Sequence, residues 1–65
     1  MRFELTQRER EVAGLASRGM AVKEIAAALI VGVRTVDFHL SNVYAKLGVA
    51  SKRELARRAS EFGLT

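Results

Sequence analysis

The sequence predicts an all-α fold, a compact four-helix domain that contains a helix-turn-helix. Apolar residues recur at helical spacing in several stretches, proline is absent, and the five glycines are expected between those stretches or near the end of the chain. The chain has 65 residues, enough for one small domain, and no cysteine, so its core must come from helix packing alone.

The first helix is expected to begin after Thr6. Residues Thr6 to Glu9 read T-Q-R-E, a capping box in which the hydroxyl and the carboxylate each accept a hydrogen bond from a backbone N–H at the helix start. Gly19 is expected to end this helix. Its buried face is predicted to consist of Val12, Leu15 and Ala16.

The second helix is expected over Val22–Leu29, without a capping side chain. Ala21 and Val22 stand where serine, threonine, asparagine or aspartate usually accepts from the first amides. Gly32, before the third helix, also lacks a side-chain acceptor. It serves either as a weak cap or as a residue with positive φ in the turn.

The third helix is predicted to have one apolar and one polar face. The apolar stripe is Val36, Leu40, Val43, Tyr44 and Leu47. At about 100° per residue, the opposite positions are Arg34, Phe38, Ser41 and Ala45, flanked by Thr35, Asn42 and Lys46 on one side and Asp37 on the other. The second helix, the turn and this helix together predict a helix-turn-helix, whose second helix can enter the major groove of DNA.

Phe38 is expected to point to solvent from the centre of the polar face. A partner that buries it is one explanation, because an aromatic among basic and small polar side chains suits a DNA groove. The alternative is a single exposed apolar residue, which is common on protein surfaces and needs no partner.

The fourth helix is predicted to begin at Ser51, because Gly48 ends the third helix and Ser51 to Glu54 read S-K-R-E, a second capping box. Its inward side is Leu55, Ala59 and Phe62. Its outward side is Arg53, Arg57, Ser60 and Glu61, with Ala56 at the margin. Without a second apolar stripe, only a weak homodimer is expected, and the free domain should be monomeric.

The net charge of +4 and the pI near 10.4 suit a polyanionic partner. From Arg34 onward the chain has six basic and three acidic residues, against five and four before that point. This placement favours phosphate binding by the third and fourth helices, and a merely solvated basic face is the alternative.

Enzymatic and metal chemistry are not expected. His39 is the one histidine, too few for a metal site without cysteine, and no catalytic partner accompanies it. It is expected to be a packed, hydrogen-bonded residue at the edge of the core. No cofactor or small-molecule ligand is expected. No apolar run approaches the ~20 residues of a membrane span, and no signal peptide is visible, so a cytoplasmic location is expected.

These segments resemble the DNA-binding domain of LuxR/FixJ/GerE-type bacterial transcription regulators. The matching pieces are LTQREREV at Leu5–Val12, Gly19, KEIAAAL at Lys23–Leu29, RTVDFHLSNVYAKLGV at Arg34–Val49, and REL at Arg53–Leu55. The resemblance implies a third helix in the major groove and dimers formed through the fourth helix on an inverted repeat. Because no sensory element fits, residues 1–65 are expected to be the C-terminal output domain of a longer regulator, such as a response regulator.

The resemblance also implies roles for individual residues. Base reading is expected from Asp37, Phe38 and Ser41. DNA backbone contacts are expected from Lys23, Arg34, Thr35, Asn42 and Lys46. Dimer contacts are expected from Arg53, Ala56, Arg57 and Ser60. Asp37 either accepts from a cytosine amino group or orients Arg34 or Ser41.

The sequence thus predicts a sequence-specific binder of double-stranded DNA that acts in transcription regulation and is not an enzyme. The rival interpretation is a protein-interaction module. In that case the exposed face around Phe38 would contact the transcription machinery, such as RNA polymerase, and the basic charge would be incidental.

Overall fold

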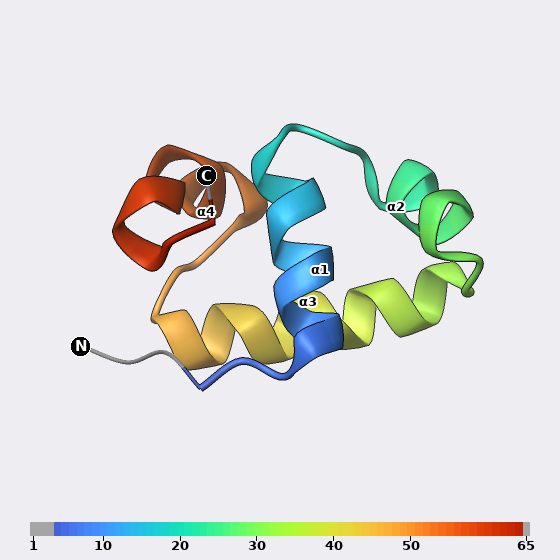
Figure 1. Cartoon of the computed structure of the whole chain (residues 1–65), viewed down its shortest axis with the longest axis horizontal. Helices are drawn as coiled ribbons and strands as arrows, with labels where there is room; N and C mark the ends of the chain where they lie inside the picture. Colours follow the sequence, from blue (N-terminus) through green and yellow to red (C-terminus); the bar gives the residue numbers. More distant parts are fainter. Residues whose placement is uncertain (1–3, 65) are drawn as a thin grey trace.

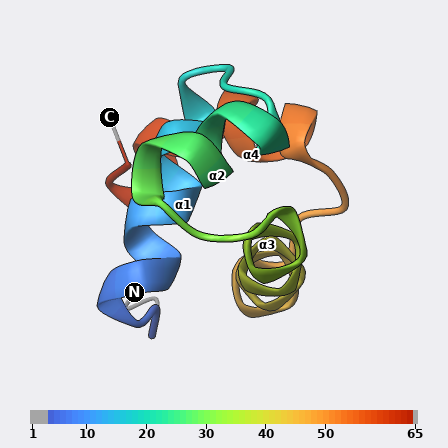
Figure 2. The ribbon, with the colours of Figure 1, turned by 90° about the vertical axis from the view of Figure 1, so that its right-hand side faces the viewer.

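The computed structural model describes residues 4–64, which form an all-α fold as predicted. The helices are α1 (Gln7–Ser17), α2 (Val22–Leu29), α3 (Val33–Leu47) and α4 (Lys52–Arg57), followed by the 3-10 helix η1 (Ala59–Phe62). Helix α1 lies at the centre and contacts α2, α3 and α4 (Figure 1). Seen nearly end-on, α3 lies below α2 and α4 (Figure 2), so its lower side is turned away from the other helices.

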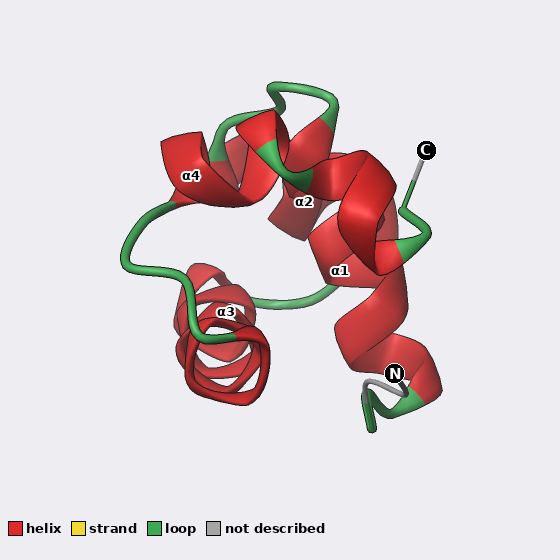
Figure 3. Cartoon of the chain, turned by 90° about the vertical axis from the view of Figure 1, so that its left-hand side faces the viewer, coloured by secondary structure: helices red, strands yellow, loops and turns green. Residues whose placement is uncertain are grey.

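The core lies between α1 and the helices around it. Its largest fully buried side chains are Ile25, Leu55, Val12, Val36 and Val43. They come from all four α-helices, and in Figure 3 α2 and α4 lie above α3 while α1 lies beside it. Within the described residues, no helix is long and apolar enough to cross a membrane.

Both ends of α1 follow the sequence prediction, and so does its buried face, since Val12 and Ala16 are buried and Leu15 packs against the core. Thr6 Oγ1 accepts from the N–H of Glu9 at 3.1 Å, and Glu9 Oε1 accepts from the N–H of Thr6 at 2.9 Å, which completes the capping box. After the helix, Gly19 adopts φ +89°, which ends it. The expectation that the glycines lie between the helical stretches or near the end of the chain was wrong for Gly14, which lies in the middle of α1.

The turn between α2 and α3 depends on Ile30 rather than on glycine. Ile30 has φ 57° and ψ 51°, the left-handed region, whereas Gly32 has φ −77° and ψ 156°. The alternative of a positive φ at Gly32 was therefore wrong, and Gly32 serves as the N-cap of α3. A β-branched residue in the left-handed region is strained, because its Cβ crowds the following carbonyl oxygen.

Serine at position 32 should stabilise the domain, because a serine side chain can accept from the first amides of α3. The backbone already has the extended N-cap conformation, and an added Cβ would meet nothing within 4 Å. We expect Gly32→Ser to increase the free energy of unfolding by a few tenths of a kcal/mol. Thermal unfolding followed by circular dichroism measures this, with Gly32→Ala, which adds no acceptor, as the control. A lower melting temperature for the serine variant would contradict the cap.

The predicted fourth helix is divided into two pieces, because α4 ends at Arg57 and the 3-10 helix η1 follows from Ala59 to Phe62. Ser51 Oγ accepts from the N–H of Glu54 at 3.1 Å, as predicted, but Glu54 Oε1 accepts from the N–H of Ala50 at 2.9 Å instead of that of Ser51. The second capping box is therefore half formed. The inward residues of this region are buried as predicted, namely Leu55, Ala59 and Phe62.

Candidate nucleic-acid interface

The two faces of α3 separate as the sequence predicted. The helix buries Val36, Leu40, Val43 and Leu47, while Tyr44 is half-buried at the edge of the core. Its opposite face exposes Arg34, Asp37, Phe38, Ser41 and Ala45. Because the buried side packs on α1 and α2, the exposed side is directed away from these two helices.

Phe38 lies at the centre of this exposed face with 63% of its surface accessible. Its ring is tilted against that of His39, with the ring centroids 5.8 Å apart. His39 is half-buried, and its Nδ1 is buried without a hydrogen-bond partner among the described residues. The expectation of a packed histidine was right, but the expected hydrogen bond is missing at this atom.

Asp37 is exposed, and its carboxylate makes no hydrogen bond or ion pair within residues 4–64. The structure therefore shows no contact through which it would orient Arg34 or Ser41. The pKa of Tyr44 is raised by burial of its hydroxyl and by the negative charge of Asp37. An unpaired carboxylate beside Phe38 repels phosphates but can accept from a base amino group.

The predicted DNA backbone contacts cluster at the starts of the two helices of the helix-turn-helix. Arg34 and Thr35 are exposed in the first turn of α3, Lys23 is exposed in the first turn of α2, and Asn42 is half-buried further along α3. Both helices lack a side-chain hydrogen bond from their N-cap residue. At α3 the first two amides, those of Val33 and Arg34, can therefore donate to phosphate oxygens. At α2 the carboxylate of Glu24 already accepts from the N–H of Ala21 at 2.8 Å.

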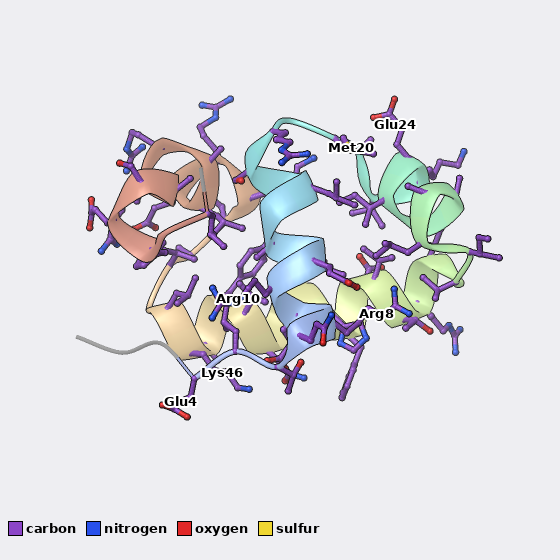
Figure 4. All side chains as sticks on the ribbon, viewed as in Figure 1. Glu4, Arg8, Arg10, Met20, Glu24 and Lys46 are labelled. Carbon is purple, nitrogen blue, oxygen red and sulfur yellow. The ribbon has the colours of Figure 1, made fainter. Side chains whose placement is uncertain are left out.

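Lys46, the remaining predicted backbone contact, has a partner within the domain. Its Nζ donates to Glu9 Oε1 at 2.7 Å, and the same oxygen accepts from the N–H of Thr6. The side chain of Glu9 is 6% exposed and that of Lys46 is 38% exposed. The hydrogen bonds from Lys46 and Thr6 lower the pKa of Glu9. Lys46 thus ties α3 to the start of α1, beside which it lies in Figure 4.

The sequence contained one signal of this ion pair that was missed. Glu9, Val12, Ala13 and Ala16 are all buried and share one side of α1. A carboxylate at the head of an apolar stripe requires a partner, because an unpaired buried charge is costly. The capping box explains Glu9 through local contacts alone, whereas Lys46 lies 37 residues further along the chain.

Some of the basic residues from Arg34 onward are paired within the domain, so the unpaired positive charge does not follow the simple count of basic residues. Arg58 pairs with Glu54 and Glu61 at 3.0 and 3.2 Å, and Lys52 donates to the carbonyl of Met20 at 2.8 Å. Within the part of the chain that the structure describes, the basic side chains without a hydrogen bond or ion pair are Arg10, Arg18, Lys23, Arg34, Arg53 and Arg57. Of these six residues, Arg34 alone lies on α3.

The predicted dimer residues lie on the outward side of α4 and η1. Arg53, Arg57 and Ser60 are exposed, and Ala56 is half-buried. Arg53 and Arg57 are one helical turn apart and unpaired. In a two-fold symmetric contact these like charges would approach each other, which opposes association at low ionic strength.

A helix-turn-helix with an exposed polar face on its second helix is the architecture of a class of DNA-binding domains. The chain matches the family model of bacterial regulatory proteins of the luxR family over residues 4–59. It therefore belongs to the luxR family and is a helix-turn-helix domain of the kind found in transcription regulators.

Individual relatives agree with this assignment. Over 54 residues, 83% of the chain, it is 56% identical to the transcriptional regulatory protein UhpA of Escherichia coli. Over its full 65 residues it is 42% identical to the response regulator Rre1 of Synechocystis. It is also 42% identical over 57 residues, 88% of the chain, to the HTH-type transcriptional regulator MalT of Serratia proteamaculans. The chain spans 28% of UhpA, 28% of Rre1 and 6% of MalT.

Proposed function

We propose that this domain reads double-stranded DNA through the exposed face of α3 and serves as the C-terminal output module of a longer transcription regulator. The family establishes DNA binding in transcription regulation as the general role. The finer proposal rests on one observation, the exposed face with Phe38 at its centre. The short span of the chain relative to UhpA and Rre1 supports a longer regulator.

The roles within this face follow from the chemistry of its residues. Phe38 offers apolar contact to thymine methyl groups, Ser41 can donate or accept, and Asp37 can accept from a cytosine amino group. Arg34, Thr35, Lys23 and Asn42 are placed to contact phosphates, which gives affinity without sequence preference. Because Lys46 is engaged by Glu9, its contribution to phosphate binding should be smaller than that of Arg34.

Dimerisation is expected to be weak and to occur on DNA. The outward side of α4 offers little apolar surface, and its two unpaired arginines repel their symmetry mates. An inverted repeat brings two copies together and supplies phosphates that screen these charges. Arg53, Ala56, Arg57 and Ser60 would then form the contact between the two copies.

Phe38→Ala should reduce discrimination between DNA sequences. We expect a loss of about 1 kcal/mol or more per half-site between preferred and random sequences, because the apolar contact with bases disappears. Selection of bound sequences from a random duplex pool measures this, with Arg34→Ala as the matched control. The control should weaken all sequences alike and reduce the salt dependence.

The same selection experiment also distinguishes DNA readout from the alternative function, a protein-interaction module. The domain is a protein-interaction module if two results are obtained together. Neither the parent nor the Phe38 variant enriches any sequence at any salt concentration, and Phe38 is required for salt-insensitive capture of RNA polymerase. A parent selection that enriches an inverted repeat, blurred by Phe38→Ala, supports DNA readout by a dimer.

A further inference from the structure

A second surface lies between α1 and α2, apart from the exposed face of α3. It is a hollow of about 350 Å³, which we call the α1–α2 hollow, lined by Arg10, Glu11, Gly14, Leu15, Arg18 and Leu29. Leu15 and Leu29 are half-buried against the core and form an apolar floor. Because α3 packs on α1 through its buried side, its exposed face is directed away from the α1 residues that line this hollow.

The packing of the domain does not require glycine at position 14. Glycine in a helix interior costs about 1 kcal/mol relative to alanine. A Cβ added to Gly14 would meet nothing within 4 Å, and Gly14 is not among the glycines with positive φ. Neither a close internal contact nor a special backbone angle therefore requires glycine here. Its missing side chain leaves the middle of the α1–α2 hollow open.

The charges at the rim of the α1–α2 hollow are unbalanced. The side chains of Arg10 and Arg18 are exposed and make no hydrogen bond or ion pair among residues 4–64. Glu11, the third charged lining residue, is already paired with Arg8 at 3.3 Å. The two arginines are eight positions apart, so their Cα atoms lie about 12 Å apart along the axis of α1. Two free cations therefore flank an apolar floor.

We propose that the α1–α2 hollow binds a short acidic amphipathic segment of a partner protein. An apolar side chain of the segment would enter over Gly14 and pack on Leu15 and Leu29, and carboxylates on either side would pair with Arg10 and Arg18. The charge of the rim selects an acidic partner, and the apolar floor distinguishes this ligand from DNA phosphates. Since the exposed face of α3 is directed elsewhere, the segment and DNA can be bound together.

The test is a titration of the ¹⁵N-labelled domain with a synthetic helical peptide that carries a central leucine pair flanked by glutamates. The same peptide with glutamines in their place is the control ligand. We expect amide shifts to centre on Gly14, Leu15 and Leu29. Gly14→Leu, which fills the hollow with a good helix former, should weaken binding by about tenfold, as when an anchoring pocket is lost. Ala28→Leu, at an exposed position of α2 outside the hollow, should leave it unchanged.

Several results would overturn this proposal. They are the absence of peptide binding at millimolar concentration, shifts centred on Phe38, equal affinity of the glutamine peptide, and an affinity that Gly14→Leu does not change. Arg18→Ala supplies an independent readout, because it should weaken the peptide but not DNA. If it weakens all DNA sequences alike, the arginines belong to the phosphate-binding surface instead, and the proposed DNA readout by α3 still stands.

Discussion

Lys46→Met should destabilise the domain, although Lys46 lies on the helix proposed to read DNA. Methionine keeps much of the aliphatic stem and removes the ammonium group, so the buried charge of Glu9 loses Lys46 and keeps its contacts with Thr6. Loss of one partner of a buried charged group costs about 1–3 kcal/mol. Because Lys46 is 38% exposed and water can reach part of the pair, we expect the lower half of this range. Thermal unfolding should show it clearly, since each kcal/mol shifts the melting temperature of a small domain by about 4–8 °C.

The same ion pair should make stability depend on pH. The folded-state pKa of Glu9 lies below its ordinary value of 4.5, so the unfolded chain takes up the proton first. The stabilisation is complete above that ordinary value and is lost as the pH falls through the lower, folded value. Glu54 also has a lowered pKa, through the N–H of Ala50 and then Arg58, and contributes in the same direction. Comparison with Glu9→Gln isolates the contribution of Glu9, because its curve should fall less steeply in acid.

The double variant Glu9→Gln with Lys46→Met provides the control. It removes both charges, so it should be more stable than the sum of the two single effects predicts. Strictly additive effects would mean that the two side chains act independently, and the ion pair would then not account for the loss. DNA affinity should be compared at a temperature where every variant is folded. A uniform loss for Lys46→Met under those conditions would show that Lys46 also contacts phosphates.

The sequence predicted those elements whose signals are local. The Thr6 box, the Gly48 stop and the apolar stripe of α3 each depend on residues a few positions apart, and each is found in the structure. The exposure of Phe38 followed from the same periodicity. Local reasoning is sufficient here because helices α1 to α3 are amphipathic and their buried faces meet in one core.

The features that sequence reasoning missed depend on tertiary contact or on backbone geometry. The pairing of Glu9 with Lys46 joins two helices far apart in the chain. Glu54 accepts from the N–H of Ala50 and not from that of Ser51, because of the backbone conformation just before α4. The α1–α2 hollow exists only once Leu29 of α2 lies beside α1. None of these has a spacing signature within a single helix.

The sequence also did not predict which residue of the turn adopts the left-handed conformation, and this residue gives the second large effect on stability. Glycine was the natural candidate at Gly32, yet the turn has its positive φ two residues earlier, at Ile30. The side chain of Ile30 is 91% exposed, so it contributes almost no burial to offset its backbone strain. Chain connectivity and the packing of α2 and α3 hold the residue in this conformation.

Ile30→Gly should therefore stabilise the domain. Relief of the left-handed strain is worth about 1–2 kcal/mol, and the greater freedom of glycine in the unfolded chain offsets about 0.5–1 kcal/mol of it. The net gain should raise the melting temperature by several degrees, as about 4–8 °C per kcal/mol predicts. Ile30→Asn should do at least as well, since asparagine tolerates the left-handed region without the entropy of glycine.

Ile30→Val is the matched control, because valine keeps the β-branch that causes the strain and should leave the melting temperature almost unchanged. A fall in stability for Ile30→Gly, together with a smaller fall for Ile30→Val, would mean that the isoleucine side chain contributes packing despite its exposure. If glycine stabilises the fold but weakens DNA binding, the isoleucine serves the interface. The strain at the turn would then be retained for function, because Ile30 lies three residues before the first turn of α3.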